Sequence, residues 1–256
     1  MNIDAAALGL LFPAMLAGLL VTATHVPLGM QVIRRGIVFI DLAIAQIAGL
    51  GVILADVLGW EPQGAAMQVA ALCAALCAAL LLTWTERRWP DVQEAIIGVI
   101  FVLASSAAVL LLAGNPHGGE HLKDLLVGQI LWVEPGRLPF VALVYVVVGG
   151  IWFGFGERIG RAGFYVLFAC TVTVSVQLVG LYLVFSTLVI PALATFYAQR
   201  RRLAQGYAVG VLGYAAGLTA SAVLDLPSGP MVVCAMVLAG LLVAGLKSQG
   251  RGTIST

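Results

Sequence analysis

The sequence predicts an all-α membrane protein, a polytopic bundle of eight to nine transmembrane helices. Its 256 residues are 61% hydrophobic and 10% charged, whereas soluble domains average about 45–50% apolar and about 25% charged residues. The apolar residues also fall into runs close to the ~20 residues that a helix needs to cross a bilayer. We therefore expect one transmembrane domain over residues 5–247 and a short tail over residues 248–256.

The positions of the basic residues predict the orientation of this bundle. Eleven of the thirteen Lys and Arg residues lie in five short gaps between apolar runs, and only Lys123 and Arg137 lie elsewhere. The five cationic gaps contain Arg34 and Arg35, Arg87 and Arg88, Arg158 and Arg161, Arg200 to Arg202, and Lys247 with Arg251. Short loops rich in Lys and Arg stay in the cytoplasm. Every second loop, and the C-terminus, is therefore expected in the cytoplasm and the N-terminus outside.

The first half of the chain supplies four candidate spans. They are Ala5–Thr24, Ile37–Leu58, Gly64–Thr85 and Ala95–Gly114. No cation precedes Arg34, so the first run lacks the charged start of a signal peptide, and we expect it to be retained. His25, followed by Pro27 and Gly29, is expected to mark the end of this first helix.

A long outer loop over residues 115–137 separates these spans from the rest. Its segment Glu120–Val133 has apolar residues at a helical spacing, which predicts a short amphipathic helix at the membrane interface. Pro135 and Gly136 end this segment.

The second half of the chain supplies five further runs. They are Leu138–Gly156, Gly163–Gly180, Leu181–Ala198, Tyr207–Leu224 and Met231–Leu246. No polar residue separates Leu181–Ala198 from the preceding run, and Pro191 lies inside it, so a broken or re-entrant element is the alternative to a ninth span.

Polar residues inside the spans are the candidate pathway residues, because an ionisable group is costly in hydrocarbon and marks functional sites. Asp41 lies about one turn into the second span and Gln46 follows it. The later spans carry Thr171, Thr173, Ser175, Gln177 and Ser186. Hydrogen bonding between helices is the alternative role of the Ser, Thr and Gln residues. For Asp41, the alternative is an ion pair with Arg34 or Arg35.

The chain contains three histidines, which are candidate metal ligands. His25 lies in the first span, and His117 and His121 flank Glu120 in the outer loop. Positions i, i+3 and i+4 share one helical face, and carboxylate and imidazole groups suit a borderline cation such as zinc. The sequence thus predicts a capture site at His117, Glu120 and His121, the alternative being histidines of a solvated loop.

Several classes of protein are excluded by what the sequence lacks. It has no G-x-x-x-x-G-K-[ST] phosphate loop, so an ATP-driven cycle would need another subunit. It also has no H-E-x-x-H, G-x-S-x-G or C-x-x-C motif, so we expect neither an enzyme nor a permanently bound cofactor. The net charge of +1 comes from cations spread over several loops, which gives no reason to expect binding of nucleic acid.

Four segments resemble the permease family of ABC importers for zinc, manganese and iron. VGLYLVFSTLVIPALATFYA from Val179 and GLTASAVLDLPSGPMVV from Gly217 are the most specific. PLGMQVIRRGIVFIDLAIAQIAGLG from Pro27 is similar to the passage from the first cytoplasmic loop into the second span, and VGQILWV from Val127 resembles the outer amphipathic segment.

The resemblance implies a homodimeric permease in the bacterial cytoplasmic membrane. Such a pair receives a divalent metal ion, here zinc before manganese or iron, from an extracytoplasmic metal-binding protein and is driven by two ABC ATPase subunits. Family members tend to carry an Asp followed four residues later by His in the second span. Asp41 corresponds to this Asp, but Ala45 occupies the i+4 position and Gln46 lies about 140° around the helix.

A second departure concerns the cytoplasmic gap that in this family includes a short helix docking into the ATPase. Here only GERIGRA remains, from Gly156 to Ala162, which is about two helical turns. Glu157, Arg158 and Arg161 are the expected ATPase-facing residues. The alternative function is a proton-coupled secondary transporter or exporter that uses Asp41, because intramembrane acids also mark proton relays.

Overall fold

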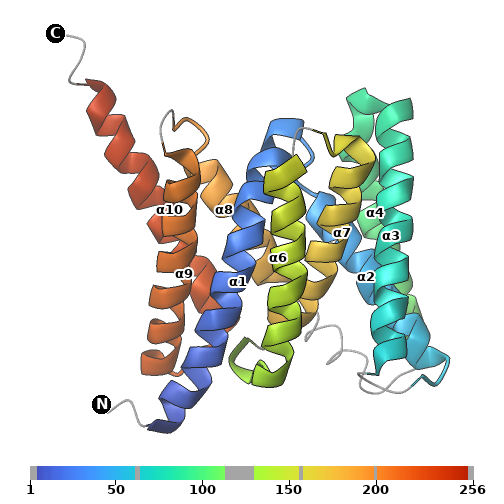
Figure 1. Cartoon of the computed structure of the whole chain (residues 1–256), viewed down its shortest axis with the longest axis horizontal. Coiled ribbons are helices and arrows are strands. Elements are labelled where there is room, and N and C mark those ends of the chain that lie inside the picture. Colours follow the sequence, from blue (N-terminus) through green and yellow to red (C-terminus); the bar gives the residue numbers. More distant parts are fainter. Residues whose placement is uncertain (1–4, 61–63, 113–129, 156–157, 199–200, 253–256) are drawn as a thin grey trace.

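The computed structural model describes residues 5–60, 64–112, 130–155, 158–198 and 201–252, and over these residues it contains helices and no strand (Figure 1). The helices are α1 (Ala5–Arg35), α2 (Ile40–Val57), α3 (Ala65–Arg88), α4 (Gln93–Leu112), α6 (Leu138–Phe155), α7 (Gly160–Val179), α8 (Leu181–Ala194), α9 (Arg202–Leu224) and α10 (Ser228–Gly252). Short 3₁₀ turns lie at Pro90–Val92, Ile130–Trp132 and Pro135–Arg137. Within this part of the chain eight helices are long and apolar enough to span a membrane, which confirms the predicted fold class.

The ninth run forms a shorter helix than predicted. α8 ends at Ala194, so its 14 residues are about 21 Å long, against a hydrocarbon core of about 30 Å. The break before it is Gly180, whose φ of 85° and ψ of 160° few other residues adopt. Pro191 lies inside α8 and does not break it, and the chain leaves the helix at Thr195.

α1 is longer than predicted, and His25 does not mark its end. The helix continues through Pro27 and Gly29 to Arg35, 31 residues in all. Proline at position 27 cannot bond to the carbonyl of residue 23, which normally stops a helix. Here the Tyr207 hydroxyl of α9 donates to the Ala23 carbonyl at 3.1 Å, so a neighbouring helix satisfies the freed group.

Four of the five cationic gaps meet at one end of the bundle, which we call the cationic end. Arg35 at the end of α1 lies 3.9 Å from the Glu86 carboxylate of α3, and its guanidinium lies 4.3 Å from the centre of the Phe164 ring of α7. Arg202 of α9 lies near enough to Arg34 for their charges to interact. The N- and C-termini lie at opposite ends of the bundle, with α10 ending on the same side as Arg35 (Figure 1).

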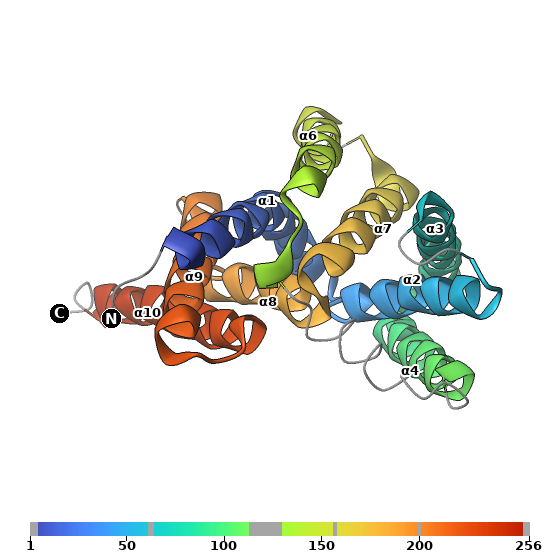
Figure 2. The ribbon, with the colours of Figure 1, turned by 90° about the horizontal axis from the view of Figure 1, so that it is seen from below.

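The helices form two groups around a continuous apolar core. The first group contains α1, α8, α9 and α10, and the second contains α2, α3, α4 and α7 (Figure 2). α6 packs against α1 and α7 and stands to one side of both groups (Figure 2). The predicted amphipathic segment Glu120–Val133 lies mostly outside the described residues.

Glycines bring the helices of the first group together. A Cβ atom on Gly29 would collide with the Leu188 carbonyl of α8, and one on Gly217 would collide with Val232 of α10. Gly210 and Gly213 likewise face Thr22 and Met236, at 2.6 and 2.7 Å from the position of a Cβ. Helices in lipid associate by close packing, so these small residues set the spacing of α1, α8, α9 and α10.

Candidate functional site

Asp41 is the buried acid of the second span. It lies in the first turn of α2, is fully buried, and neither carboxylate oxygen has a hydrogen-bond partner among the described residues. The alternative role, an ion pair with Arg34 or Arg35, is not observed, and Arg35 pairs with Glu86 instead. A carboxylate in this position has the free lone pairs that a passing cation or proton would use.

His25 is the second buried group with a free binding atom. Its Nδ1 lies 3.0 Å from the Val21 carbonyl and 3.1 Å from the Thr24 hydroxyl. A carbonyl can only accept, so the bond to Val21 places the proton on Nδ1 and leaves the Nε2 lone pair available. Nε2 has no partner in the described part of the chain. Metal-binding histidines commonly hold their other nitrogen in this way.

A tyrosine and a serine extend the polar region from α1 toward α7. The Tyr145 ring of α6 stands edge-on to the His25 ring, with 6.5 Å between the ring centres. Ser175 donates to the Thr171 carbonyl at 2.6 Å, so its oxygen accepts the hydrogen bond from the Tyr145 hydroxyl at 2.5 Å. Thr171 and Ser175 are thus buried as predicted and bond to protein groups.

A matching pair joins α9 to α8. The Tyr214 hydroxyl lies 2.9 Å from the Thr187 hydroxyl, which itself donates to the Leu183 carbonyl at 2.7 Å, so Tyr214 is the donor. Ser186, the predicted residue next to Thr187, is 6% exposed.

The two predicted glutamines lie in different places. Gln46 lines a cavity of about 10 Å³ with Val176 of α7 and Leu181 of α8, which is room for about one water molecule. Gln177 is exposed and, with Gln68 of α3, lines a separate groove of about 570 Å³ between α3, α6 and α7. The structure therefore does not bring Gln177 beside Ser175.

The remaining predicted residues come from the outer-loop segment and from the region around the start of α7. His117, Glu120, His121 and Glu157 lie outside the described residues, and Arg158 and Arg161 are exposed at the gap between α6 and α7. Over the ranges that the structure describes, no three His, Cys, Asp or Glu residues form a group that would hold a metal ion. Asp41 and His25 are each a single buried group that could offer a ligand atom.

The whole length of the described bundle matches one protein family. The ABC 3 transport family matches residues 7–160 and 153–247. The chain belongs to this family. The resemblance to the permeases of metal ABC importers is confirmed, and the chain is a multi-pass protein of the bacterial cytoplasmic membrane.

Two relatives of this chain are membrane proteins of metal transport systems. The high-affinity zinc uptake system membrane protein ZnuB of Haemophilus influenzae is 25% identical over 246 residues, which cover 88% of this chain and 92% of ZnuB. The manganese transport system membrane protein MntC of Halalkalibacterium halodurans is 24% identical over 243 residues, covering 86% and 81%.

Two solved structures share the fold of this chain. PsaBC from Streptococcus pneumoniae in complex with Fab superimposes with a TM-score of 0.70 at 19% identity, covering 91% of this chain and 89% of that chain. An inward-facing transporter of the metal-chelate ABC type gives a TM-score of 0.69 at 15% identity, covering 96% and 90%.

Several polar residues of the site are not apparent from the sequence of this ABC 3 protein. Tyr145, Tyr214 and Thr187 lie in apolar runs, where an aromatic or a single hydroxyl gives no periodic signal. Their one available signal is chemical, because a tyrosine hydroxyl buried in a membrane needs a partner and so predicts a second polar group on a facing helix.

Proposed function

We propose that this chain is the membrane-spanning permease of an ABC importer for a divalent metal ion, with zinc the first expectation and manganese or iron the others. It would act as a homodimer, receive the ion from an extracytoplasmic metal-binding protein and be driven by separate ATPase subunits. The family match over residues 7–160 and 153–247 carries this proposal. ZnuB and MntC, by their names, serve zinc uptake and manganese transport.

The two buried side chains, Asp41 and His25, offer ligand atoms that suit a metal ion as the cargo. Asp41 offers oxygen and His25 offers the Nε2 lone pair, and both atoms lack protein partners in the described part of the chain. Carboxylate and imidazole groups suit zinc, and oxygen ligands also suit manganese, so the donors do not favour one metal over the other. An ion held by few ligands can leave again, which a transport pathway requires.

The cationic end supports an ATPase on that side. The chain has no phosphate loop of its own, and Arg158 and Arg161 at the short gap between α6 and α7 are exposed. We assign this end to the cytoplasm from the distribution of Lys and Arg. The ATPase would contact the short gap together with the neighbouring ends of α1, α3 and α9.

Uptake by reconstituted vesicles tests the proposal. The permease is purified with its ATPase, placed in liposomes with the binding protein outside, and supplied with zinc or manganese. We expect uptake that requires ATP and the ATPase and that continues when a protonophore collapses the proton gradient. Uptake that persists without any ATPase would refute the proposal.

Asp41→Ala should lower the maximal rate of metal uptake by at least about tenfold while leaving the amount of purified complex unchanged, because it removes an ionisable group from the pathway. Ala43, also buried in α2, provides a matched control as Ala43→Ser, which places a small polar group on another face. Unchanged uptake in Asp41→Ala would show that the ion does not pass along α2.

The isolated carboxylate of Asp41 also favours a second candidate, a proton-coupled transporter or exporter. A buried acid without a counter-ion can hold a proton, which is how proton relays cross membranes. This candidate predicts that a protonophore and Asp41→Asn each abolish transport and that removal of ATP has no effect.

A further inference from the structure

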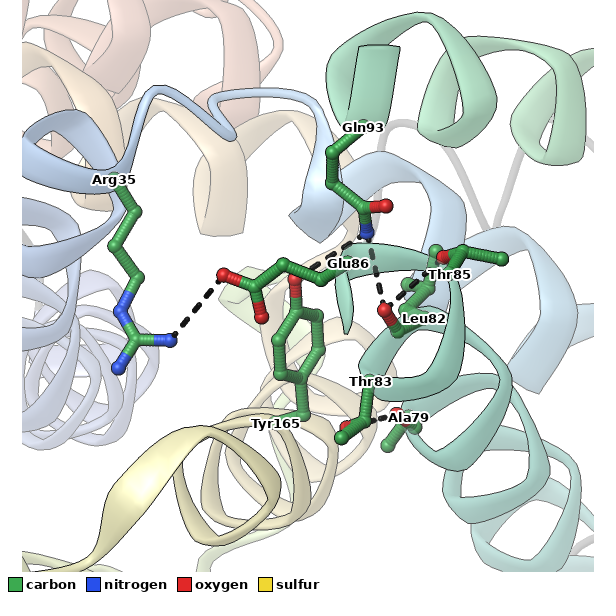
Figure 3. A network of polar contacts seen from close by, with 8 residues as sticks. All are labelled: Arg35, Ala79, Leu82, Thr83, Thr85, Glu86, Gln93 and Tyr165. Carbon is green, nitrogen blue, oxygen red and sulfur yellow. Dashed lines mark hydrogen bonds and ion pairs between the residues drawn. The ribbon is translucent and has the colours of Figure 1, made fainter. Parts of the chain in front are cut away.

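A cluster of polar side chains joins four helices at the cationic end (Figure 3). Arg35 of α1 pairs with Glu86 of α3 at 3.9 Å, with the two side chains only 21% and 15% exposed. The Arg35 guanidinium also covers the Phe164 ring of α7 at 4.3 Å. Glu86 lies beside the Tyr165 hydroxyl of α7 (Figure 3). The Glu86 carboxylate thus lies between the end of α1 and the start of α7.

Gln93, in the first turn of α4, ties this cluster to a further helix. Its amide nitrogen donates to the Leu82 carbonyl of α3 at 3.1 Å and to the Tyr165 hydroxyl at 3.4 Å (Figure 3). Gln93 is 3% exposed, so water does not replace these bonds when the side chains move apart.

The neighbouring residue Glu94 reaches the start of α2. Its carboxylate accepts a hydrogen bond from the Phe39 backbone N–H at 3.2 Å. Phe39 is the N-cap of α2, and its side chain cannot cap the helix. The Glu94 carboxylate of α4 therefore accepts a hydrogen bond at the start of α2. Asp41 follows in the first turn of the same helix. Two consecutive residues of α4 therefore connect Tyr165 of α7 with the turn that holds Asp41.

The cluster has unused hydrogen-bonding atoms, which allows it more than one arrangement. Glu86 Oε2, Gln93 Oε1 and Glu94 Oε2 are buried and have no partner among the residues that the structure describes. Arg35 Nη1 makes its ion pair but no hydrogen bond. A donor and acceptors that are already desolvated can exchange partners without exposing new polar groups. Elements with two such arrangements are what energetic coupling between distant sites requires.

We propose that Gln93 and Glu94 are positioning residues that join the start of α7 to the first turn of α2, so that movement of the short gap before α7 reaches Asp41. The inference rests on the proposed function and identifies how a gap of only four residues between α6 and α7 can act without a docking helix of its own. α7 begins at Gly160, two residues after Arg158, and Tyr165 lies about 1.4 turns further along this helix.

The ratio of metal carried to ATP hydrolysed tests this inference, measured on the complete complex in liposomes with zinc. Tyr165→Phe removes the hydroxyl that Gln93 contacts and keeps the ring, and Glu94→Ala removes the acceptor for Phe39. We expect each to lower the zinc carried per ATP by about threefold to tenfold, the effect of one lost hydrogen bond. Glu94→Gln keeps a carbonyl acceptor and should retain most of the ratio.

Thr83→Val is the matched control. The Thr83 hydroxyl lies in the same region of α3 but bonds only to the Ala79 carbonyl of its own helix, at 2.7 Å (Figure 3). It should keep the wild-type ratio, because its bond joins no second helix.

The outcomes separate this inference from the proposed function. A wild-type ratio in both Tyr165→Phe and Glu94→Ala overturns the inference alone, as does an equal loss in Thr83→Val. A variant could also lower the amount of folded complex, so that ATP hydrolysis and zinc uptake fall together and the zinc carried per ATP stays unchanged. That result would show a merely structural role and would also overturn the inference. Should Glu94→Ala fail to assemble, Tyr165→Phe decides. A wild-type complex without ATP-driven uptake refutes the proposed function itself.

Discussion

The two helix groups are held together by different means. In the first group, α1, α8, α9 and α10 approach closely enough that Gly29, Gly210 and Gly217 leave no room for a side chain. In the second group, Gly51 of α2 makes such an approach toward α3, while Gly98 of α4 has no atom within 4 Å of its Cβ position. Polar side chains at the cationic end join the second group to α1.

This difference indicates which group is suited to move. Close backbone packing is lost steeply with distance, so we expect the first group to behave as one rigid unit. Polar contacts with spare donors and acceptors can exchange partners, as in the cluster of Arg35, Glu86 and Gln93. The following variants test this contrast, from the largest expected effect to the smallest.

Gly29→Ala should cost the most stability. Its new methyl group would meet the Leu188 backbone carbonyl, which cannot turn aside as a side chain can. We expect a loss of about 1–3 kcal/mol, the usual cost of overpacking, measured as the thermal unfolding of the purified protein in detergent. Gly98→Ala, on an open face of α4, should leave the unfolding temperature nearly unchanged. Equal losses in the two variants would contradict a rigid first group.

Glu86→Gln should cost about 1 kcal/mol, because it keeps the shape of the side chain but leaves the partly buried Arg35 charge without its partner. The cost should shrink in high salt, which screens partly exposed charges, whereas that of Gly29→Ala should not change. Unfolding curves at low and high salt measure both. A salt-independent effect of Glu86→Gln would mean that the pair contributes by packing alone.

Tyr207→Phe should have the smallest effect, about 0.6 kcal/mol, the average worth of a hydrogen bond between membrane helices. It removes the donor to the Ala23 carbonyl that Pro27 leaves free. In a Pro27→Ala background the backbone N–H of residue 27 can bond to this carbonyl, so Tyr207→Phe should then cost less. If Tyr207→Phe costs the same stability in the wild-type and Pro27→Ala proteins, Tyr207 does not compensate for Pro27.

The membrane fold and the gathering of the cationic gaps at one end of the bundle were predictable, because both depend on local sequence. Runs of about 20 apolar residues and the Arg pairs between them need no knowledge of distant contacts. The end of α1 was wrongly placed at His25, because Pro27 is tolerated through Tyr207, which lies 180 residues further along the chain. A local proline rule cannot include such a partner.

The candidate site was predictable in part for the same reason. Asp41 stood out because a charge in an apolar run is rare, and the structure finds it buried and unpaired. Glu86, Gln93 and Glu94 lie at the ends of spans, where polar residues are ordinary, so nothing in their spacing indicated contacts with Tyr165 or Phe39. Their arrangement depends on how α3, α4 and α7 pack.

The 14-residue helix α8 is largely enclosed by its neighbours, since eight of its residues are buried. Its length falls about 9 Å short of an ordinary hydrocarbon core, and Phe196 and Tyr197, which follow it, are 40% and 77% exposed. Exposed aromatic side chains settle at the level of the lipid headgroups. We therefore expect Tyr197 at one membrane surface, whereas the other end of α8, at Gly180 and Leu181, is buried within the bundle, so the short helix requires no thinning of the bilayer.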